Sequence, residues 1–125
     1  MASKVSLAEV FGRFDEAWSP KIAGSVNDMH VRVAKFRGAF IWHFHEREDE
    51  LFLVHKGRLL MRFRDREIHL GPGEFIIVPK GVEHMPAAES DECEILTLSP
   101  STLLNTGNVE NERTVRELGR LGSSK

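Results

Sequence analysis

Short segments in which apolar and polar residues alternate dominate the middle of this chain. β-branched and aromatic residues fill these segments, and turn-forming pairs such as Lys56-Gly57 and Asp65-Arg66 separate them. Evenly spaced short strands without intervening helical patterns favour an all-β sandwich or barrel over a doubly wound α/β sheet. The pattern predicts strands at 30–37, 40–44, 50–55, 58–64, 67–70, 74–78 and 94–98.

A helical pattern precedes these strands. Ser6 and Glu9 form a capping box, in which the serine caps the helix and the glutamate lies three residues later. Apolar residues then recur at helical spacing, at Val10, Phe11, Phe14 and Trp18. Ser19-Pro20 would end the helix, because proline cannot continue the hydrogen-bond ladder. We expect a short amphipathic helix over residues 7–18, with Phe14 and Trp18 packed on the outside of the barrel.

The chain divides into three parts by its sequence texture. Residues 1–29 carry the predicted helix and a connecting arm, and residues 30–100 carry the predicted barrel. Residues 101–125 form a polar C-terminal tail that would either form a short helix or remain loose. Because 125 residues are enough for one buried core but few for two, we expect a single barrel with two flanks.

Composition narrows the class of partner. Charged residues make up 29% of the chain and sum to a net charge of −2, so we expect neither a nucleic-acid partner nor a membrane-surface partner. No apolar run approaches the roughly 20 residues that span a bilayer, and the N-terminus lacks the apolar region of a signal peptide. The only cysteine, Cys93, excludes an intramolecular disulfide. We expect a cytoplasmic protein that binds a small molecule.

Histidines in two separated segments are the candidates for chemistry. His43 and His45, two residues apart, would point to the same side of a strand. His84 lies further along, after the turn-forming pair Lys80-Gly81. Imidazoles with one carboxylate suit a divalent transition ion such as Fe, Mn, Ni, Co, Zn or Cu, and an octahedral ion would keep positions open for water, substrate or dioxygen.

Three acidic residues could supply that carboxylate. Glu50 opens the next apolar strand, and Glu48 would share its face if the strand began earlier, whereas Asp49 would point outward. A buried carboxylate beside three buried imidazoles would cost several kcal/mol of desolvation without a cation. Residue chemistry therefore predicts a metal site and leaves Glu50 and Glu48 as alternatives.

Two motifs resemble those of the cupin family. The first runs from Gly38 through His43-Phe-His45 and Glu50 to Gly57, with four residues instead of the usual five after its first glycine. The second is Gly73-Glu-Phe-Ile-Ile-Val-Pro79-Lys-Gly81-Val-Glu-His84, and Ala88 stands where asparagine is often found. Together they cover roughly residues 30–100.

The resemblance implies a jelly-roll barrel, also called a double-stranded β-helix, with a metal ion inside near one mouth. It implies that the ligands are His43, His45, Glu50 and His84, because the motif spacing favours Glu50 over Glu48. Cupins include dioxygenases, sugar-phosphate isomerases and epimerases, and non-catalytic storage or sensing domains. Fold alone therefore does not choose the chemistry.

Our first functional hypothesis is a metal-dependent enzyme, dioxygenase-like or isomerase/decarboxylase-like, that acts on a small oxygen-bearing molecule. Glu50 would be a ligand only, or would leave the metal to act as the catalytic base. The alternative is a non-catalytic module that binds a metal and a small ligand for storage or sensing. A metal-free carbohydrate isomerase would need a dedicated acid and base that we do not find.

Strand parity also predicts which apolar residues face outward. Phe40, Trp42 and Phe44 alternate with the two histidines, so they should point away from the metal. Such a face needs a cover, from the N-terminal helix, a neighbouring subunit or both, and we expect a homodimer. Parity places Phe52 and Val54 inside the barrel, and we expect its remaining lining to be Ile41, Leu59, Met61, Phe63, Phe75 and Ile77.

Overall fold

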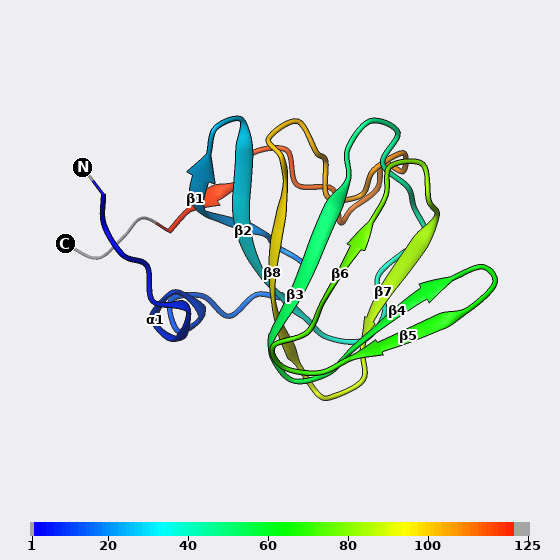
Figure 1. Cartoon of the computed structure of the whole chain (residues 1–125), viewed down its shortest axis with the longest axis horizontal. Helices are drawn as coiled ribbons and strands as arrows, with labels where there is room; N and C mark the ends of the chain where they lie inside the picture. Colours follow the sequence, from blue (N-terminus) through cyan, green and yellow to red (C-terminus); the bar gives the residue numbers. More distant parts are fainter. Residues whose placement is uncertain (1, 122–125) are drawn as a thin grey trace.

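Strands are the main regular elements of the computed structural model, which describes residues 2–121 (Figure 1). They form a six-stranded sheet in the order β6-β3-β8-β2-β1-β9 and a three-stranded sheet in the order β5-β4-β7. All pairs are antiparallel except β1 with β9. The elements are α1 (Leu7–Phe11), β1 (Lys21–Val26), β2 (Met29–Phe36), β3 (Glu50–Lys56), β4 (Leu59–Phe63), β5 (Glu67–Leu70), β6 (Phe75–Val78), β7 (His84–Ala88), β8 (Cys93–Pro100) and β9 (Gly119–Arg120).

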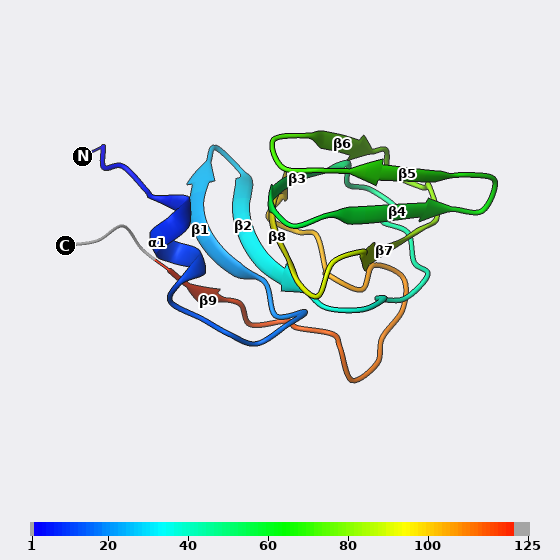
Figure 2. The ribbon, with the colours of Figure 1, turned by 90° about the horizontal axis from the view of Figure 1, so that it is seen from below.

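The two sheets share one apolar core, and the predicted all-β jelly roll is confirmed. Figure 2 shows the strands curled around a common interior, although the two sheets do not close into one ring of hydrogen bonds. Residues from both sheets pack in that interior: Phe36, Phe52, Val54, Leu59, Met61, Phe63, Leu70, Val78 and Ile95. No helix in the described part of the chain is long and apolar enough to cross a membrane.

The predicted strand at 40–44 does not form, whereas every other predicted strand does. Residues 37–49 follow an extended path with isolated bridges from Ala39 to Ala87 and from His43 to His84. Strands β1 and β7 were missed, because Lys21–Val26 lacks clear alternation and β7 carries a proline and two alanines. The predicted tail pairs with β1 through β9 and forms no helix within residues 101–121, while residues 122–125 lie outside the described part.

The N-terminal helix is shorter than predicted. Ser6 caps α1 as expected, its hydroxyl accepting a hydrogen bond from the Glu9 amide at 3.3 Å, but the helix ends at Gly12. Phe14 packs in the cluster under α1, whereas Trp18 stacks on Phe36 with ring centroids 4.3 Å apart. A continuous helix would hold both rings on one face, so the prediction of a helix to residue 18 with Trp18 outside the barrel is wrong.

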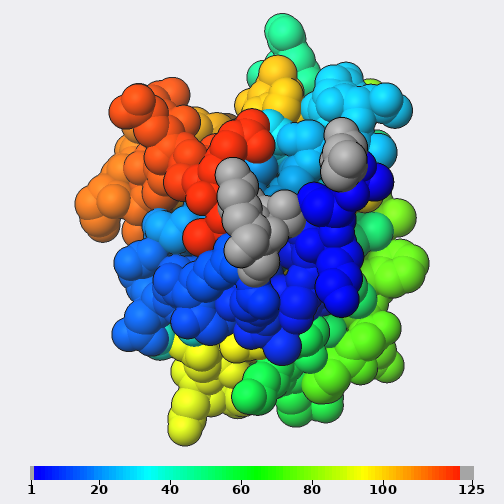
Figure 3. Space-filling model, turned by 90° about the vertical axis from the view of Figure 1, so that its left-hand side faces the viewer, coloured from blue at the N-terminus to red at the C-terminus, as the bar shows by residue number. Residues whose placement is uncertain are grey.

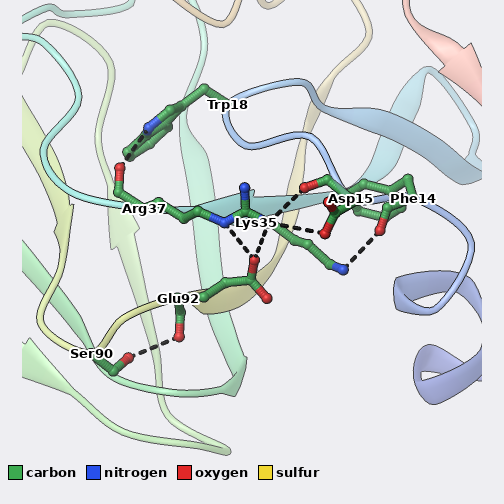
Figure 4. Close-up of polar contacts among 7 residues, drawn as sticks. All are labelled: Phe14, Asp15, Trp18, Lys35, Arg37, Ser90 and Glu92. Carbon is green, nitrogen blue, oxygen red and sulfur yellow. Dashed lines mark hydrogen bonds and ion pairs between the residues drawn. The ribbon is translucent and has the colours of Figure 1, made fainter.

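A hydrogen-bond network holds the segment that carries Trp18 (Figure 4). The Trp18 indole N–H donates to the Arg37 carbonyl at 2.9 Å, and the Arg37 guanidinium donates to the Asp15 carbonyl at 2.7 Å and to the Glu92 carboxylate at 2.8 Å. The Trp18 amide donates to the Lys35 carbonyl at 2.8 Å. These contacts fix Trp18 at a left-handed φ of 59°.

Helix α1 covers one part of the outer face of the six-stranded sheet. Val10 and Phe11 are almost fully buried and pack against Ala23 of β1 and Val33 of β2. Both ends of the described chain reach this side of the molecule, blue and red in Figure 3, and the Leu121 amide donates to the Ile22 carbonyl. Strand β2 is therefore buried on both of its faces.

The outer face near β6 is left uncovered. Glu50 and Phe52 of β3 face inward, as predicted, and pair with Val78 and Ile76 of β6. Phe75 and Ile77 therefore point outward and are 60% and 54% exposed, so the prediction that they line the barrel is wrong. The four consecutive apolar residues of β6 carry no alternation, and parity could not be determined from them.

Candidate metal centre

Three histidines from separate segments meet inside the barrel. His43 and His45 come from the extended segment between β2 and β3, and His84 is the first residue of β7. His43 and His84 exchange both backbone hydrogen bonds, at 3.0 and 2.9 Å, which places their side chains next to each other. One nitrogen from each ring lies within 4.8 Å of the other two, and the three residues are at most 4% exposed.

Backbone carbonyls orient two of these rings. Nδ1 of His43 donates to the Ile41 carbonyl and Nδ1 of His84 donates to the Val82 carbonyl, each at 2.9 Å. Because a carbonyl oxygen only accepts, Nδ1 carries the proton and Nε2 keeps its lone pair. Metal-binding histidines have this arrangement, in which the second nitrogen is held by an outer partner.

Several of the buried ring nitrogens lack a hydrogen-bond partner. Within residues 2–121, no partner is present for Nε2 of His84 or for either ring nitrogen of His45. A buried polar atom without a partner costs about 1–3 kcal/mol, so a protein core that holds three of them is unfavourable by itself. A metal ion would bind one nitrogen of each ring and so reduce this cost, and the residues present therefore fit a metal.

Glu50 lies beside the histidines and outside their tightest cluster. Its Oε1 is 3.3 Å from Nε2 of His45, without the alignment of a hydrogen bond. The rival carboxylates are engaged elsewhere, since Glu48 accepts from the Thr102 hydroxyl and Asp49 accepts from the Lys80 amide, both at 2.8 Å. Of the three acidic candidates, Glu50 is the buried one, at 7% exposed.

Burial keeps the imidazoles of His43 and His84 neutral. It lowers the pKa of His43 to about 3, with a further contribution from the neighbouring His84, and it also lowers the pKa of His84. Only a neutral imidazole offers a lone pair to a metal. His43 and His84 are therefore in their metal-binding protonation state at neutral pH.

The C-terminal segment holds the His43–His45 segment in place. Asn108 accepts from the Phe44 amide at 2.9 Å through its side chain and donates to the Phe44 carbonyl at 3.1 Å through its backbone. Gly107 has a φ of +58°, and a Cβ there would lie only 2.2 Å from the Phe44 oxygen. In Figure 1 this orange segment crosses the upper end of the molecule. Sequence reasoning missed its role, although Asn105-Thr-Gly-Asn108 carries turn-forming residues.

A cavity of about 40 Å³ is lined by His43 and Glu50. Trp18 stacks on Phe36 and Phe40 along its wall, so Phe40 does not point away from the site as predicted. Trp42, from the same predicted outward face, lies under the Arg64 guanidinium at 3.9 Å. The polar residues that line the cavity are Arg32, His43, Glu50, Thr97 and Asn105.

Comparison with known proteins agrees with this architecture. The family model for the cupin domain matches residues 29–99. The crystal structure of a cupin-2 domain-containing protein from Shewanella frigidimarina is 40% identical, with a TM-score of 0.75 over 77% of this chain and 93% of that one. A protein from Neisseria meningitidis is 25% identical, with a TM-score of 0.72 over 79% of this chain and all of that one.

A curated relative is also similar in sequence. The uncharacterized protein YdbB of Bacillus subtilis is 45% identical over 60 residues, which are 47% of this chain and 53% of that protein. The match thus spans about half the length of that relative.

Proposed function

The chain belongs to the cupin family, and from this premise we propose that it binds one divalent transition ion and acts on a small oxygen-bearing molecule. The proposed ligands are His43, His45, His84 and Glu50. The observation that carries this proposal is the convergence of buried imidazole nitrogens that have no other partner. Three nitrogen donors and one carboxylate oxygen favour Fe, Mn, Ni, Co, Zn or Cu over calcium.

The residues around the proposed ion would have different roles in binding and catalysis. His43 and His84 would present Nε2 because the Ile41 and Val82 carbonyls hold their Nδ1 protons. A bound ion would supply Lewis acidity toward substrate oxygens, or redox chemistry with dioxygen if it is iron. Glu50, next to His45, is the proposed base for an isomerase or decarboxylase and otherwise a ligand. The aromatic wall of the cavity would exclude water from the reacting molecule.

Metal analysis of matched variants tests this proposal. His45→Gln removes a ring whose nitrogens have no hydrogen-bond partner among the described residues, so the substitution breaks no hydrogen bond of that ring. His69→Gln is the control, because His69 is exposed and pairs with Glu89. We expect one equivalent of metal in the wild-type protein and in H69Q, and at least a tenfold weaker affinity in H45Q. Equal affinity in H45Q and wild type would refute the ligand set.

Turnover assays separate the proposed enzyme classes. Oxygen uptake by the iron-loaded protein with diketones, enediols or 2-oxo acids would support a dioxygenase. Isomerisation or decarboxylation with a redox-silent ion such as zinc would support the second class. Bound metal without turnover in either assay would favour the non-catalytic storage or sensing module.

We also propose that the protein is a homodimer, through a surface different from the one that the sequence suggested. Two cross-strand rows of apolar residues form the outer face of β6, β3 and β8, which no other element covers in the described part of the chain. A contiguous apolar face at the edge of a sheet is suited to a second copy related by two-fold symmetry. The rows are Phe75, Leu53 and Leu96, and Ile77, Leu51 and Leu98.

Light scattering after size-exclusion chromatography tests the dimer. Phe75→Lys combined with Ile77→Lys should convert it to a monomer, whereas Val26→Lys, at an exposed apolar residue of β1 that is 56% exposed, should leave it intact. A wild-type monomer would refute the proposal.

We further propose a cytoplasmic location and a barrel domain of residues 30–100 with two flanks. The free, buried Cys93 is compatible with a reducing compartment.

A further inference from the structure

A buried arginine faces the cavity beside the candidate metal centre. Arg32, only 2% exposed, lies in β2 opposite Thr97 of β8, which in turn lies opposite Phe52 of β3. Arg32 lines the same cavity as His43 and Glu50. Ala34 and Phe36, two and four residues further along the strand, also face the interior of the barrel.

The Arg32 guanidinium is poorly satisfied by the protein. Within residues 2–121 it forms no ion pair, and its Nε has no hydrogen-bond partner. Its two hydrogen bonds are long, 3.3 Å to the Ser101 carbonyl and 3.4 Å to Nδ1 of His30. Burying a cation without a paired anion costs several kcal/mol, whereas an apolar residue would fill the position at no such cost.

A second unsatisfied group lies on the same inward face. Ser99 of β8 is fully buried, and its hydroxyl has no partner among the described residues. It follows Thr97 by two residues and lies opposite His30, diagonal to Arg32 in the sheet. Arg32 lines the cavity with an Nε that has no acceptor, and the Ser99 hydroxyl on the same face of the sheet has none either; these donors favour an acceptor from a bound molecule.

The charges already present do not replace that acceptor. Burial lowers the pKa of Arg32, and the carboxylates of Glu50 and Glu48 oppose this effect from a distance, without contact. An arginine remains charged even so, because its unperturbed pKa is about 12 or higher. Glu50 would be further committed to a bound cation in the proposed metal site.

We infer that Arg32 anchors the carboxylate of the substrate, so that the small oxygen-bearing molecule of the proposed function is a small carboxylic acid. The planar guanidinium matches a carboxylate with two parallel hydrogen bonds. A cavity of about 40 Å³ restricts the acid to a few non-hydrogen atoms, and the Trp18 and Phe40 rings would contact its apolar part. This inference rests on the proposed function, because it places the acid next to the proposed metal.

Calorimetric titration of matched acids and amides tests the anchor. The probes are pyruvate with pyruvamide, lactate with lactamide and glycolate with glycolamide, each titrated into the nickel-loaded protein. The amide keeps the shape of the acid and removes its charge. We expect the wild-type protein to bind at least one acid about tenfold or more tightly than its amide. The ratio should fall close to one in Arg32→Gln and stay unchanged in Arg62→Gln, a half-buried arginine paired with Glu67 and absent from the lining of the cavity.

The outcomes separate this inference from the proposed metal site. No preference for any acid in the metal-loaded wild-type protein would overturn the inference, as would an R32Q protein that keeps the wild-type ratio. If Arg32 only balances the charge of Glu50, R32Q will lower thermal stability or metal content without changing the ratio. Elemental analysis of the same samples tests the metal proposal independently, because absence of nickel from the wild-type protein would refute that proposal alone. The acid-to-amide ratio would then still be measured on the metal-free protein.

Discussion

Gly107→Ala should disrupt the candidate metal centre through the backbone of Phe44. A Cβ at residue 107 would lie 2.2 Å from the Phe44 oxygen, 3.0 Å from its carbonyl carbon and 3.1 Å from Cδ2 of His43. A carbon normally approaches an oxygen to about 3.3–3.6 Å, so the Phe44 peptide must move by roughly 1 Å. Phe44 joins His43 to His45, and its displacement would therefore shift two of the three imidazoles.

The expected cost has two parts. A left-handed backbone, with φ of +58° at Gly107, costs a non-glycine residue about 1–2 kcal/mol. Forcing the Phe44 backbone aside adds about 1–3 kcal/mol, as for other overpacked sites. We therefore expect the free energy of unfolding to fall by roughly 2–5 kcal/mol and the metal affinity to fall in the variant that remains folded.

Gly73→Ala provides the matched control. Gly73 has a φ of +83° and nothing within 4 Å of an added Cβ, so it carries only the backbone cost of about 1–2 kcal/mol. Urea denaturation gives the free energies, and calorimetric titration with nickel gives the affinities. Equal destabilisation by the two substitutions, with unchanged nickel affinity in G107A, would refute the idea that Gly107 sets the position of the His43–His45 segment.

Two further predictions concern buried titratable groups. The pKa of His43 is about 3 in the folded protein, mainly through burial, and 6.5 is its ordinary value. The unfolded chain thus takes up a proton first, and the stability of the metal-free protein should be full above pH 6.5 and fall as the pH drops toward 3. Urea titrations with chelator should show this loss, and constant stability from pH 7 to 4 would contradict it. Burial raises the pKa of the Cys93 thiol to about 12, so a chromogenic disulfide reagent at pH 8 should react with it only after unfolding; rapid labelling of the native protein would contradict its burial.

The sequence predicted the parts of the fold that depend on local patterns. Strands with one face buried, such as β3 and β8, alternate in burial along the chain and could be located from the sequence. The helix was overextended because Phe14 and Trp18 have helical spacing but pack against different parts of the molecule. The segment around Phe44 was taken for a strand because it alternates, whereas its backbone bonds to the loop at Asn108. Long-range pairing of this kind leaves no local signal.

The same physics explains why the candidate site was found only in part. His43, His45 and His84 are chemically distinctive, and their meeting was predicted from spacing and from a family resemblance. The aromatic wall of the cavity was not predicted, because Trp18 and Phe40 reach it from segments whose direction depends on the complete fold. Apolar side chains that line a cavity have the same composition as those that fill a core.

The role of Arg32 could not be predicted from the sequence pattern, as a comparison with Lys35, a second cation on the same strand, shows. Because β2 is covered by α1 on one face and by the barrel interior on the other, every residue from Arg32 to Phe36 is buried and the two-residue period disappears. Lys35, on the outer face, has its ammonium satisfied by the Phe14 carbonyl at 2.8 Å and lies 5.1 Å from the centre of the Phe14 ring. Arg32, on the inner face, has no comparable partner within the described chain. Since the fold satisfies one buried cation of β2 and leaves the other facing a cavity that His43 and Glu50 also line, a bound carboxylate is the partner that best completes the second.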